Sequence, residues 1–246
     1  MRDELSAIVL AGGLGTRLRS VLGGRPKVLA PIAGRPFLDY LLRHLRAQGV
    51  RRVFLSTGFG AEQLEAFVGD GSAWGLSLTS IRDPEPLGTG GAIAHVFSRI
   101  PDLRRSFVLN GDTFFTGSLR RLLEEHLDRP DAQATIALVR SEQTDRYGSV
   151  RINAQDHRVE AFIEKASAIG PAWINAGVYV LERSFAARIA ESGPCSLEWD
   201  VFPRWVGRGL YGVPFPEAAF LDIGTPEDYA RAEAFLKSWS VDAHGI

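Results

Sequence analysis

The stretch SAIVLAGGLGTRL, residues 6–18, decides the fold. Residues 6–11 form a short apolar run followed by glycines, which is typical of a buried strand rather than a helix. Glycines stand at positions 12, 13 and 15, and without a Cβ they let the backbone turn sharply and approach a ligand closely. The N–H groups of such a loop can bind phosphate oxygens. The stretch therefore predicts a buried strand that runs into a phosphate-binding loop.

Outward from this stretch, the first half of the chain alternates strands and helices. A helix is expected from Pro36 until Gly49, because apolar residues recur there at helical spacing and proline suits a first helical position. This alternation predicts a parallel, doubly wound sheet. Further strands are expected over residues 52–57, 76–81 and 107–110, and further helices over 61–68 and 90–98.

The second half has a different character, with strands and few helices between them. We expect strands over residues 134–140, 148–152, 158–164, 173–181, 210–214 and 219–223, and a closing helix over 226–239. These strands indicate a mixed, partly antiparallel extension of the sheet. No internal repeat or linker separates the halves. The sequence therefore predicts one α/β domain over residues 1–246, a Rossmann-like three-layer α/β/α sandwich with a mixed, mostly parallel central sheet.

Composition excludes several classes of function. The chain has 246 residues and a formal net charge of −1, so no general field attracts it to nucleic acid or to a membrane surface. Cys195 is the only cysteine, which excludes an intrachain disulfide and a thiolate metal cage, and the five histidines lack metal-ligand spacing. The N-terminal MRDE lacks a signal-peptide pattern, and no apolar span of about 18 residues occurs. We expect a cytoplasmic protein with no nucleic-acid or membrane partner.

Two cations follow the glycine loop, Arg17 and Lys27. A dinucleotide-binding fold would place a third glycine where Leu18 stands and would open its helix directly. A reaction in which a triphosphate loses pyrophosphate instead needs fixed cations, because negative charge moves onto the leaving group. At about 4 Å and an effective dielectric near 20, one charge pair is worth roughly 4 kcal/mol. The alternative interpretation is a structural glycine turn with solvated cations.

Two aspartates end expected strands, Asp112 in NGD and Asp222 in DIGT. In open α/β sheets, ligands bind at the carboxyl ends of the strands. Mg²⁺ commonly takes one or two carboxylates together with substrate phosphate and water. Either aspartate alone would be an ordinary turn residue. Together with a phosphate loop in the same chain, they predict a Mg²⁺ site.

These motifs resemble those of the sugar-1-phosphate nucleotidyltransferases. The loop LAGGLGTRL with the later PK, the run LNGDT and the run FLDIGTPEDY all match that family's pattern. The resemblance implies a Mg²⁺-dependent enzyme that joins a nucleoside triphosphate to a sugar 1-phosphate and releases pyrophosphate. It also implies that Arg17 grips the leaving phosphates, that Lys27 lies near the reacting α-phosphorus, and that Asp112 and Asp222 bind Mg²⁺. Catalytic roles are thereby predicted for Arg17, Lys27, Asp112, Lys165 and Asp222.

The acceptor half contains the short motif EK at 164–165 and the run WINAGVY at 173–179. A sugar phosphate needs a cation for its phosphate and polar groups for its hydroxyls, although an EK pair is more often a solvated surface pair. The resemblance places the lysine on the acceptor phosphate, but Ala166 stands where many relatives have proline. The predicted sugar-phosphate-binding residues are Asn110, Gly111, Tyr147, Gly148, Glu164, Lys165, Asn175 and Gly177.

The segment DPEPLGTGG, residues 83–91, lies against the nucleobase if the resemblance holds. Relatives that use thymidylyl or uridylyl donors tend to have glutamine where Asp83 stands. A carboxylate only accepts hydrogen bonds, which suits the adjacent N–H donors of guanine and opposes the carbonyls of thymine. Asp83 and Glu85 thus favour GTP, unless both are exposed turn charges. The predicted nucleotide-binding residues are Leu10, Ala11, Gly12, Gly13, Gly15, Thr16, Arg17, Lys27, Asp83, Glu85, Gly88, Thr89 and Asp112.

Over its whole length the chain is most similar to the bacterial D-glycero-D-manno-heptose 1-phosphate guanylyltransferases within this family. The resemblance implies that GTP and a heptose 1-phosphate give GDP-heptose, with nucleotide binding over about residues 1–130 and sugar-phosphate binding over about 131–246. A homodimer is compatible with the sequence. The alternatives are a uridylyl- or thymidylyltransferase acting on another hexose or cyclitol 1-phosphate, and a regulatory subunit that binds a nucleotide sugar without turnover.

Overall fold

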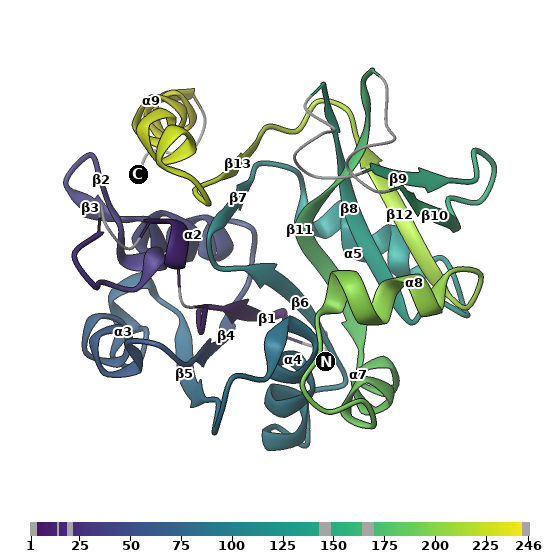
Figure 1. Cartoon of the computed structure of the whole chain (residues 1–246), viewed down its shortest axis with the longest axis horizontal. Coiled ribbons are helices and arrows are strands. Elements are labelled where there is room, and N and C mark those ends of the chain that lie inside the picture. The colour runs from purple at the N-terminus through teal and green to yellow at the C-terminus, as the bar shows by residue number, and fades with distance from the viewer. Residues whose placement is uncertain (1–3, 14, 19–21, 143–148, 164–169, 243–246) are drawn as a thin grey trace. The chain divides into compact units, whose positions relative to one another are not determined.

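The computed structural model describes residues 4–13, 15–18, 22–142, 149–163 and 170–242. Its main element is a mixed seven-stranded sheet in the order β12-β8-β11-β6-β1-β4-β5 (Figure 1). Neighbours β1, β4 and β5 are parallel, β12 is parallel to β8, and β11 is antiparallel to β8. The predicted α/β fold with a mixed, mostly parallel sheet is confirmed. The strands are β1 (Ser6–Leu10), β4 (Arg52–Thr57), β5 (Ser77–Arg82), β6 (Arg105–Asn110), β8 (Ala134–Ser141), β11 (Ala172–Glu182) and β12 (Leu210–Phe215).

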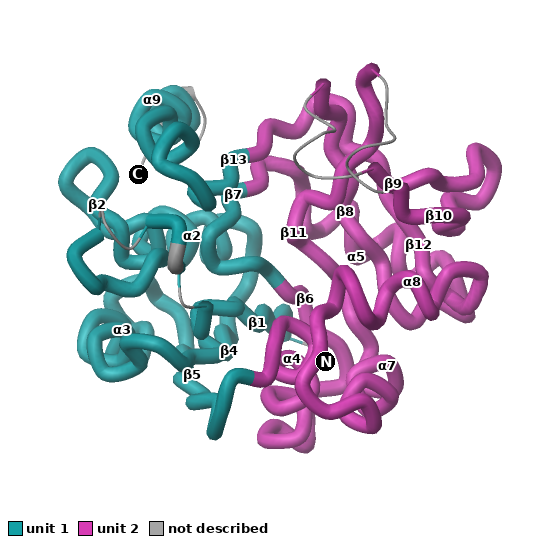
Figure 2. The backbone as a smooth tube through the Cα atoms, viewed as in Figure 1, with its two compact units in different colours: residues 1–86, 109–114, 221–246 teal, residues 87–108, 115–220 magenta. Residues whose placement is uncertain are grey.

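The chain forms two compact units, which are coloured separately in Figure 2. Unit 1 comprises residues 1–86, 109–114 and 221–246, and unit 2 comprises residues 87–108 and 115–220. The predicted division into nucleotide-binding and sugar-phosphate-binding halves concerns ligands, and it stays a prediction. Within the described residues, no helix is both long enough and apolar enough to span a membrane.

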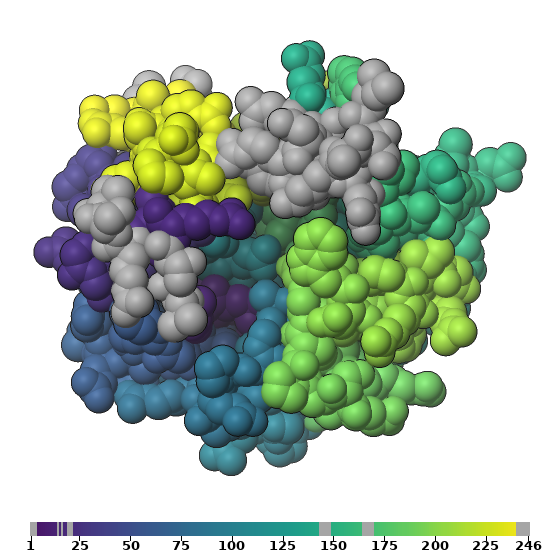
Figure 3. Space-filling view, in the orientation of Figure 1, coloured from purple at the N-terminus to yellow at the C-terminus, as the bar shows by residue number. Residues whose placement is uncertain are grey.

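Unit 1 covers its strands with helices whose apolar faces the sequence specifies. The first of them, α2, buries Phe37, Leu38 and Leu41 along one face, in keeping with their helical spacing. The C-terminal helix α9, yellow in Figure 3, lies beside the purple N-terminal segments, and Tyr229 donates a hydrogen bond to the carbonyl of Pro31. The elements are α2 (Phe37–Ala47), α3 (Ala61–Val68), α9 (Pro226–Asp242), η1 (Thr16–Leu18), η2 (Lys27–Leu29), η3 (Ser72–Trp74) and the short strands β2 (Pro31–Ile32) and β3 (Arg35–Pro36).

A core centred on Phe114 holds unit 1 together. The Phe114 ring lies 4.9 Å from the rings of both His44 and Trp239. Leu18 from the glycine loop and Ile223 from the second aspartate motif are both fully buried in the same cluster. Burial at about 25 cal/mol per Å² of apolar surface makes this cluster a major stabilising contribution. The core therefore joins three segments that are far apart in the sequence.

Unit 2 contains helices that the sequence analysis did not predict. The sequence analysis assigned no helix to the segments that form α5 (Leu119–Leu127), α7 (Arg183–Ala190) and α8 (Phe202–Trp205). These helices have between four and nine residues, so they show little more than two turns of the helical period. Unit 2 also contains α4 (Gly88–Arg99), the π-helical turn η5 (Leu197–Val201) and the hairpin β9 (Ser149–Ile152) with β10 (Val159–Ile163).

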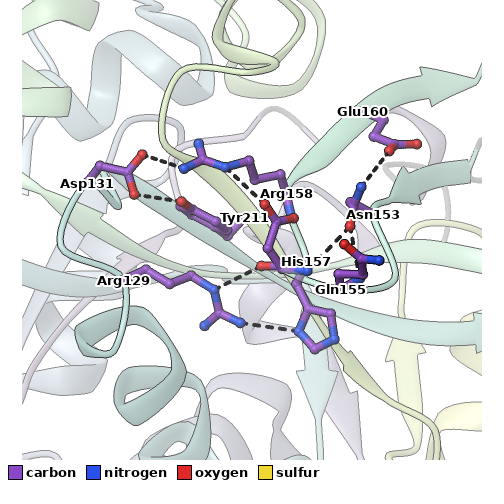
Figure 4. A network of polar contacts seen from close by, with 9 residues as sticks. Arg129, Asp131, Asn153, Gln155, His157, Arg158, Glu160 and Tyr211 are labelled. Atoms are coloured by element: carbon purple, nitrogen blue, oxygen red, sulfur yellow. Dashed lines mark hydrogen bonds and ion pairs between the residues drawn. The ribbon is translucent and has the colours of Figure 1, made fainter.

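A polar network around Tyr211 fastens this hairpin to the rest of unit 2 (Figure 4). The Tyr211 hydroxyl donates to Asp131 Oδ1 at 2.6 Å, and Arg158 donates to Asp131 Oδ2 at 2.8 Å. The guanidinium groups of Arg158 and Arg129 lie 4.9 and 5.2 Å from the Tyr211 ring centre. Because Arg158 directly precedes β10 and Tyr211 lies on β12, the network joins the hairpin to the sheet.

This network predicts an alkaline dependence of stability. Burial, followed by the hydrogen bond to Asp131, raises the pKa of Tyr211 to about 12 from its ordinary value of 10.0. The phenol ionises earlier in the unfolded chain, so its contribution is complete below pH 10 and is lost as the pH rises toward 12. Tyr211→Phe should lower the free energy of unfolding at pH 8 by about 1 kcal/mol.

Urea unfolding at a series of pH values measures both effects. The wild type should lose stability more steeply than Tyr211→Phe between pH 10 and pH 12. Equal slopes in that window would show that the phenol is not held neutral by folding.

Candidate functional site

The glycine loop begins where β1 ends, in unit 1. Ala11 N–H donates to the carbonyl of Ser56 at 2.9 Å, and Gly111 N–H donates to the carbonyl of Leu10 at the same distance. Gly13 is exposed, and a Cβ built on it would meet no atom within 4 Å. Among the described residues, the N–H groups of Gly12 and Gly13 donate no hydrogen bond. The loop therefore offers backbone donors of the kind that bind phosphate.

Close packing explains two glycines of this site. A Cβ on Gly111 would lie 2.5 Å from the Leu10 carbonyl oxygen, and a Cβ on Gly58 would lie 3.0 Å from that of Gly12. Gly15 has a φ of 56°, in the left-handed region that favours glycine. Gly111 is therefore required by backbone packing, and its predicted contact with the sugar phosphate stays a prediction.

Lys27 lies between the two aspartates of the sequence motifs. Its Nζ donates a hydrogen bond to Asp112 Oδ2 and lies 3.8 Å from Asp222 Oδ1. The Lys27 side chain is 15% exposed and those of Asp112 and Asp222 are 34% and 26% exposed, so solvent screens these charges only in part. Lys27 comes from η2, Asp112 follows β6, and Asp222 ends a strand more than 100 residues further along the chain. The structure thus brings three predicted catalytic residues together.

The strand that carries Asp222 is paired in a way that the sequence analysis did not predict. This strand, β13 (Phe220–Asp222), pairs with β7 (Thr113–Phe115) in a separate two-stranded sheet rather than with the seven-stranded sheet. Ile223 N–H donates to the carbonyl of Asp112 at 3.0 Å. Because side chains alternate along a strand, burial of Leu221 and Ile223 in the Phe114 core directs Asp222 away from that core.

The electrostatics of the two carboxylates suit a divalent cation. Burial and, next, the negative charge of Asp112 raise the pKa of Asp222 to about 6, and the Lys27 charge only partly opposes this. The buried Oδ1 of Asp222 has no hydrogen-bond partner among the described residues. Hard divalent ions such as Mg²⁺ take one or two carboxylates and complete their shell with phosphate and water. Asp112 and Asp222 therefore have the chemistry to hold a divalent cation.

Arg17 and Leu18 point in different directions within η1. Leu18 is fully buried in the Phe114 core, whereas Arg17 is exposed and forms no ion pair with any described residue. The position where a dinucleotide fingerprint would have its third glycine is thus a core position. This packing leaves the Arg17 guanidinium available to a phosphate group.

The predicted base-reading carboxylates differ in their surroundings. Asp83 follows β5, and its Oδ2 accepts a hydrogen bond from the Ser56 hydroxyl at 3.2 Å. A Cβ on Gly12 would lie 3.4 Å from the same oxygen, so Asp83 borders the glycine loop. Glu85 is exposed. Of the two, Asp83 is the residue held beside the loop.

Gly88 and Thr89 open α4 in unit 2 and pack against a turn around Cys195. Cys195 N–H donates to the Leu87 carbonyl at 2.9 Å, and Gly90 N–H donates to the Cys195 carbonyl at 2.9 Å. Gly88 has a φ of 69°, and its Cβ would lie 2.4 Å from the Cys195 oxygen. The sequence analysis expected these glycines to lie against the nucleobase and to open a helix. It missed their packing against Cys195 because the two segments are about 100 residues apart.

The described sugar-side residues Asn175 and Asn110 carry polar amide groups, within β11 and at the end of β6 respectively. Asn175 lies on β11 beside an irregularity in the pairing with β8, and its Oδ1 accepts the N–H of Gly177 at 2.8 Å. The buried Oδ1 of Asn110, at the end of β6, has no hydrogen-bond partner among the described residues. Tyr147, Gly148, Glu164 and Lys165 lie outside the described residues.

Comparison with known proteins settles the family. Residues 6–238 match the nucleotidyl transferase family. This chain belongs to that family. The family resemblance deduced from the motifs is thereby confirmed.

Three relatives illustrate the likeness. The chain is 39% identical to the mannose-1-phosphate guanylyltransferase of Mycobacterium tuberculosis, over 95% of this chain but only 65% of that protein. It is 38% identical to the D-glycero-alpha-D-manno-heptose 1-phosphate guanylyltransferase of Aneurinibacillus thermoaerophilus, over 96% of this chain and 100% of that protein. The crystal structure of HddC from Yersinia pseudotuberculosis superposes with a TM-score of 0.82 at 34% identity, over 94% of this chain and 99% of HddC.

Replacing the Asp222 carboxylate by an amide should have opposite effects on stability and on activity. Because the raised pKa of Asp222, about 6, lies above its ordinary value of 3.8, its charged form destabilises the ligand-free protein above pH 6. Asp222→Asn should therefore raise the Tm of the ligand-free protein at pH 7.5, and the gain should shrink toward pH 4. Turnover, measured as pyrophosphate release, should fall by roughly 10²–10³.

Differential scanning calorimetry supplies the Tm. Glu217→Gln makes the same carboxylate-to-amide change in an exposed turn and should leave Tm and turnover unchanged. A lower Tm for Asp222→Asn at pH 7.5 would mean that the attraction to Lys27 outweighs burial and repulsion.

Proposed function

We propose that this protein joins GTP to D-glycero-α-D-manno-heptose 1-phosphate, giving GDP-heptose and pyrophosphate. The observation that carries the proposal is the Lys27 ammonium between Asp112 and Asp222, beside a glycine loop with available N–H donors. Support for the donor and acceptor comes from relatives that are named heptose 1-phosphate guanylyltransferases. We place the reaction in the cytoplasm, in keeping with the sequence-based expectation.

The chemistry requires no protein nucleophile. An oxygen of the sugar phosphate attacks the α-phosphorus of GTP, a new P–O bond forms, and the bond to the β-phosphate breaks to release pyrophosphate. Catalysis then consists of positioning and charge stabilisation, as in other phosphoryl-type transfers. The backbone of Gly12 and Gly13 and the side chain of Arg17 bind the leaving phosphates, and Lys27 stabilises charge at the α-phosphate.

Asp112 and Asp222 would hold Mg²⁺, which when bound neutralises phosphate charge during the displacement. The two aspartates would fix the position of the ion, because both carboxylates are on segments that the core of unit 1 anchors. On the acceptor side, Asn110 and Asn175 offer amide groups to sugar hydroxyls. Lys165 and Glu164 keep their predicted roles at the acceptor phosphate and the hydroxyls.

Base selection is assigned to Asp83. Its carboxylate is held by Ser56 next to Gly12, whereas Glu85 is exposed. A carboxylate accepts from the adjacent N1–H and N2–H of guanine, and it would face carbonyl oxygens in thymine. HddC, a structural relative, has been crystallised in complex with GMP-PN.

A second acceptor has specific support. The relative from M. tuberculosis is named a mannose-1-phosphate guanylyltransferase and is 39% identical. Mannose 1-phosphate is therefore the alternative acceptor, with the same donor and the same chemistry.

A matrix of substrates tests the proposal. Pyrophosphate release is measured with GTP, UTP, dTTP and ATP against heptose, mannose and glucose 1-phosphates. We expect the highest kcat/KM for GTP with the heptose phosphate. Preference for UTP or dTTP would contradict the donor, preference for mannose would select the alternative acceptor, and no release with any pair would indicate a non-catalytic binding subunit.

Asp83→Asn tests the base assignment. The amide keeps the size of the side chain but presents a donor, so the preference for GTP over dTTP in kcat/KM should narrow by about 10- to 100-fold. Glu85→Gln is the matched control and should keep the wild-type preference. An unchanged preference in Asp83→Asn would mean that other groups read the guanine.

A further inference from the structure

Glu198 lies outside every role assigned above, yet it gathers three hydroxyl groups. Its Oε2 accepts from Thr89 Oγ1 at 2.9 Å and from Ser196 Oγ at 3.1 Å, and its Oε1 accepts from the Tyr179 hydroxyl at 3.2 Å. Among the described residues, no lysine, arginine or histidine forms an ion pair with it. The residue lies on η5, a single π-helical turn, and such turns are frequent at functional sites.

The turn that contains Cys195 and Glu198 fixes the start of α4, the segment predicted to lie against the nucleotide. The Thr89 hydroxyl has one proton, which it donates to Glu198, and it accepts the N–H of Leu197 at 2.7 Å. It therefore has no proton to donate to a nucleotide. The backbone bonds between Cys195 and the residues at 87 and 90 hold the same helix start from the same turn. Thr89 thus acts by fixing the backbone that follows Gly88.

On the sugar side, the same carboxylate orients Asn175. The Tyr179 hydroxyl donates to Glu198 and accepts from Asn175 Nδ2 at 2.9 Å. Gly177 N–H can only donate, so it selects the oxygen of the Asn175 amide and leaves Nδ2 facing Tyr179. Among the described residues, one N–H and one oxygen lone pair of that amide remain for a ligand, which matches neighbouring hydroxyls of a sugar.

We propose that Glu198 is a positioning residue that couples the two substrates through one hydrogen-bonded relay. The relay runs from Thr89 at the start of α4, through Glu198 and Tyr179, to the Asn175 amide. Hydrogen bonds to an ionised acceptor are roughly twice as strong as neutral ones, so the carboxylate orients the hydroxyl protons on both arms. The inference rests on the proposed function, which places the nucleobase at the first end and the sugar hydroxyls at the other.

Steady-state kinetics with the substrate pair found active provide the first test. Glu198→Gln should raise the KM for the sugar 1-phosphate and the KM for GTP by about 5- to 30-fold each, with a smaller change in kcat. Tyr179→Phe should raise only the sugar KM, and Thr89→Val only the GTP KM. Glu191→Gln is the matched control, because it makes the same change at an exposed residue after α7.

A cycle of unfolding free energies tests the relay without any substrate. Thr89→Val and Tyr179→Phe are made singly and together, in the wild type and in Glu198→Gln. The two substitutions should be non-additive when Glu198 is present and additive in Glu198→Gln, because only the carboxylate joins them. Additive effects in both backgrounds would overturn the relay.

The two measurements separate this inference from the proposed function. A wild type that releases no pyrophosphate with any pair would contradict the proposed function, while the unfolding cycle still tests the relay. An active wild type with both KM values unchanged in Glu198→Gln would overturn the positioning role, even if the Tm fell. If Glu198→Gln does not fold, the same kinetic measurements on Tyr179→Phe and Thr89→Val test the relay. Unchanged KM values in Tyr179→Phe would overturn the sugar side of the relay, and unchanged KM values in Thr89→Val would overturn its nucleotide side.

Discussion

The interaction on which the site depends is the contact of the Lys27 ammonium with two carboxylates of like charge. Burial of the Asp222 carboxyl and, next, repulsion by the charge of Asp112 raise the pKa of Asp222 to about 6. In the ligand-free chain Lys27 offsets only part of the cost. A site that carries such a cost favours the arrival of a cation together with phosphate groups. The unfavourable electrostatics of Asp222 are therefore what a site for a cation and phosphate groups is expected to show, in keeping with the proposed function.

The core of unit 1 anchors the segments that carry the two carboxylates. Phe114 follows Asp112 by two residues, Leu221 and Ile223 flank Asp222, and all three apolar residues are buried in one core. Leu18 from the glycine loop joins the same cluster. Packing therefore fixes the carboxylates and the phosphate loop against one another, and a loosened core would be expected to damage the site before it unfolds the protein.

Local patterns predicted the fold well where glycine or proline marks the boundaries of an element. The expected strand at residues 52–57 and helix at 61–68 coincide with β4 (Arg52–Thr57) and α3 (Ala61–Val68). Short helices such as α8 (Phe202–Trp205) were missed, because four residues carry no periodic signal. The strand of Asp222 was expected, but its pairing with β7 outside the main sheet could not be read from local sequence.

In the candidate site, too, residues in local motifs could be predicted and contacts between distant segments could not. Motifs with local spacing led to Lys27, Asp112 and Asp222, which the structure brings together, although their roles stay predictions. The contacts of Thr89 with Glu198 and of Leu87 with Cys195 join residues about 100 positions apart and leave no local pattern. They became visible only once both segments were placed in space.

Anomalous scattering from crystals grown with Mn²⁺ and a non-hydrolysable GTP analogue tests the central claim most directly. Mn²⁺ favours oxygen ligands as Mg²⁺ does and can be located by its own signal. The account predicts a peak in contact with carboxylate oxygens of both Asp112 and Asp222 and with a phosphate oxygen of the analogue. A nucleotide bound with its metal away from these two carboxylates would contradict it.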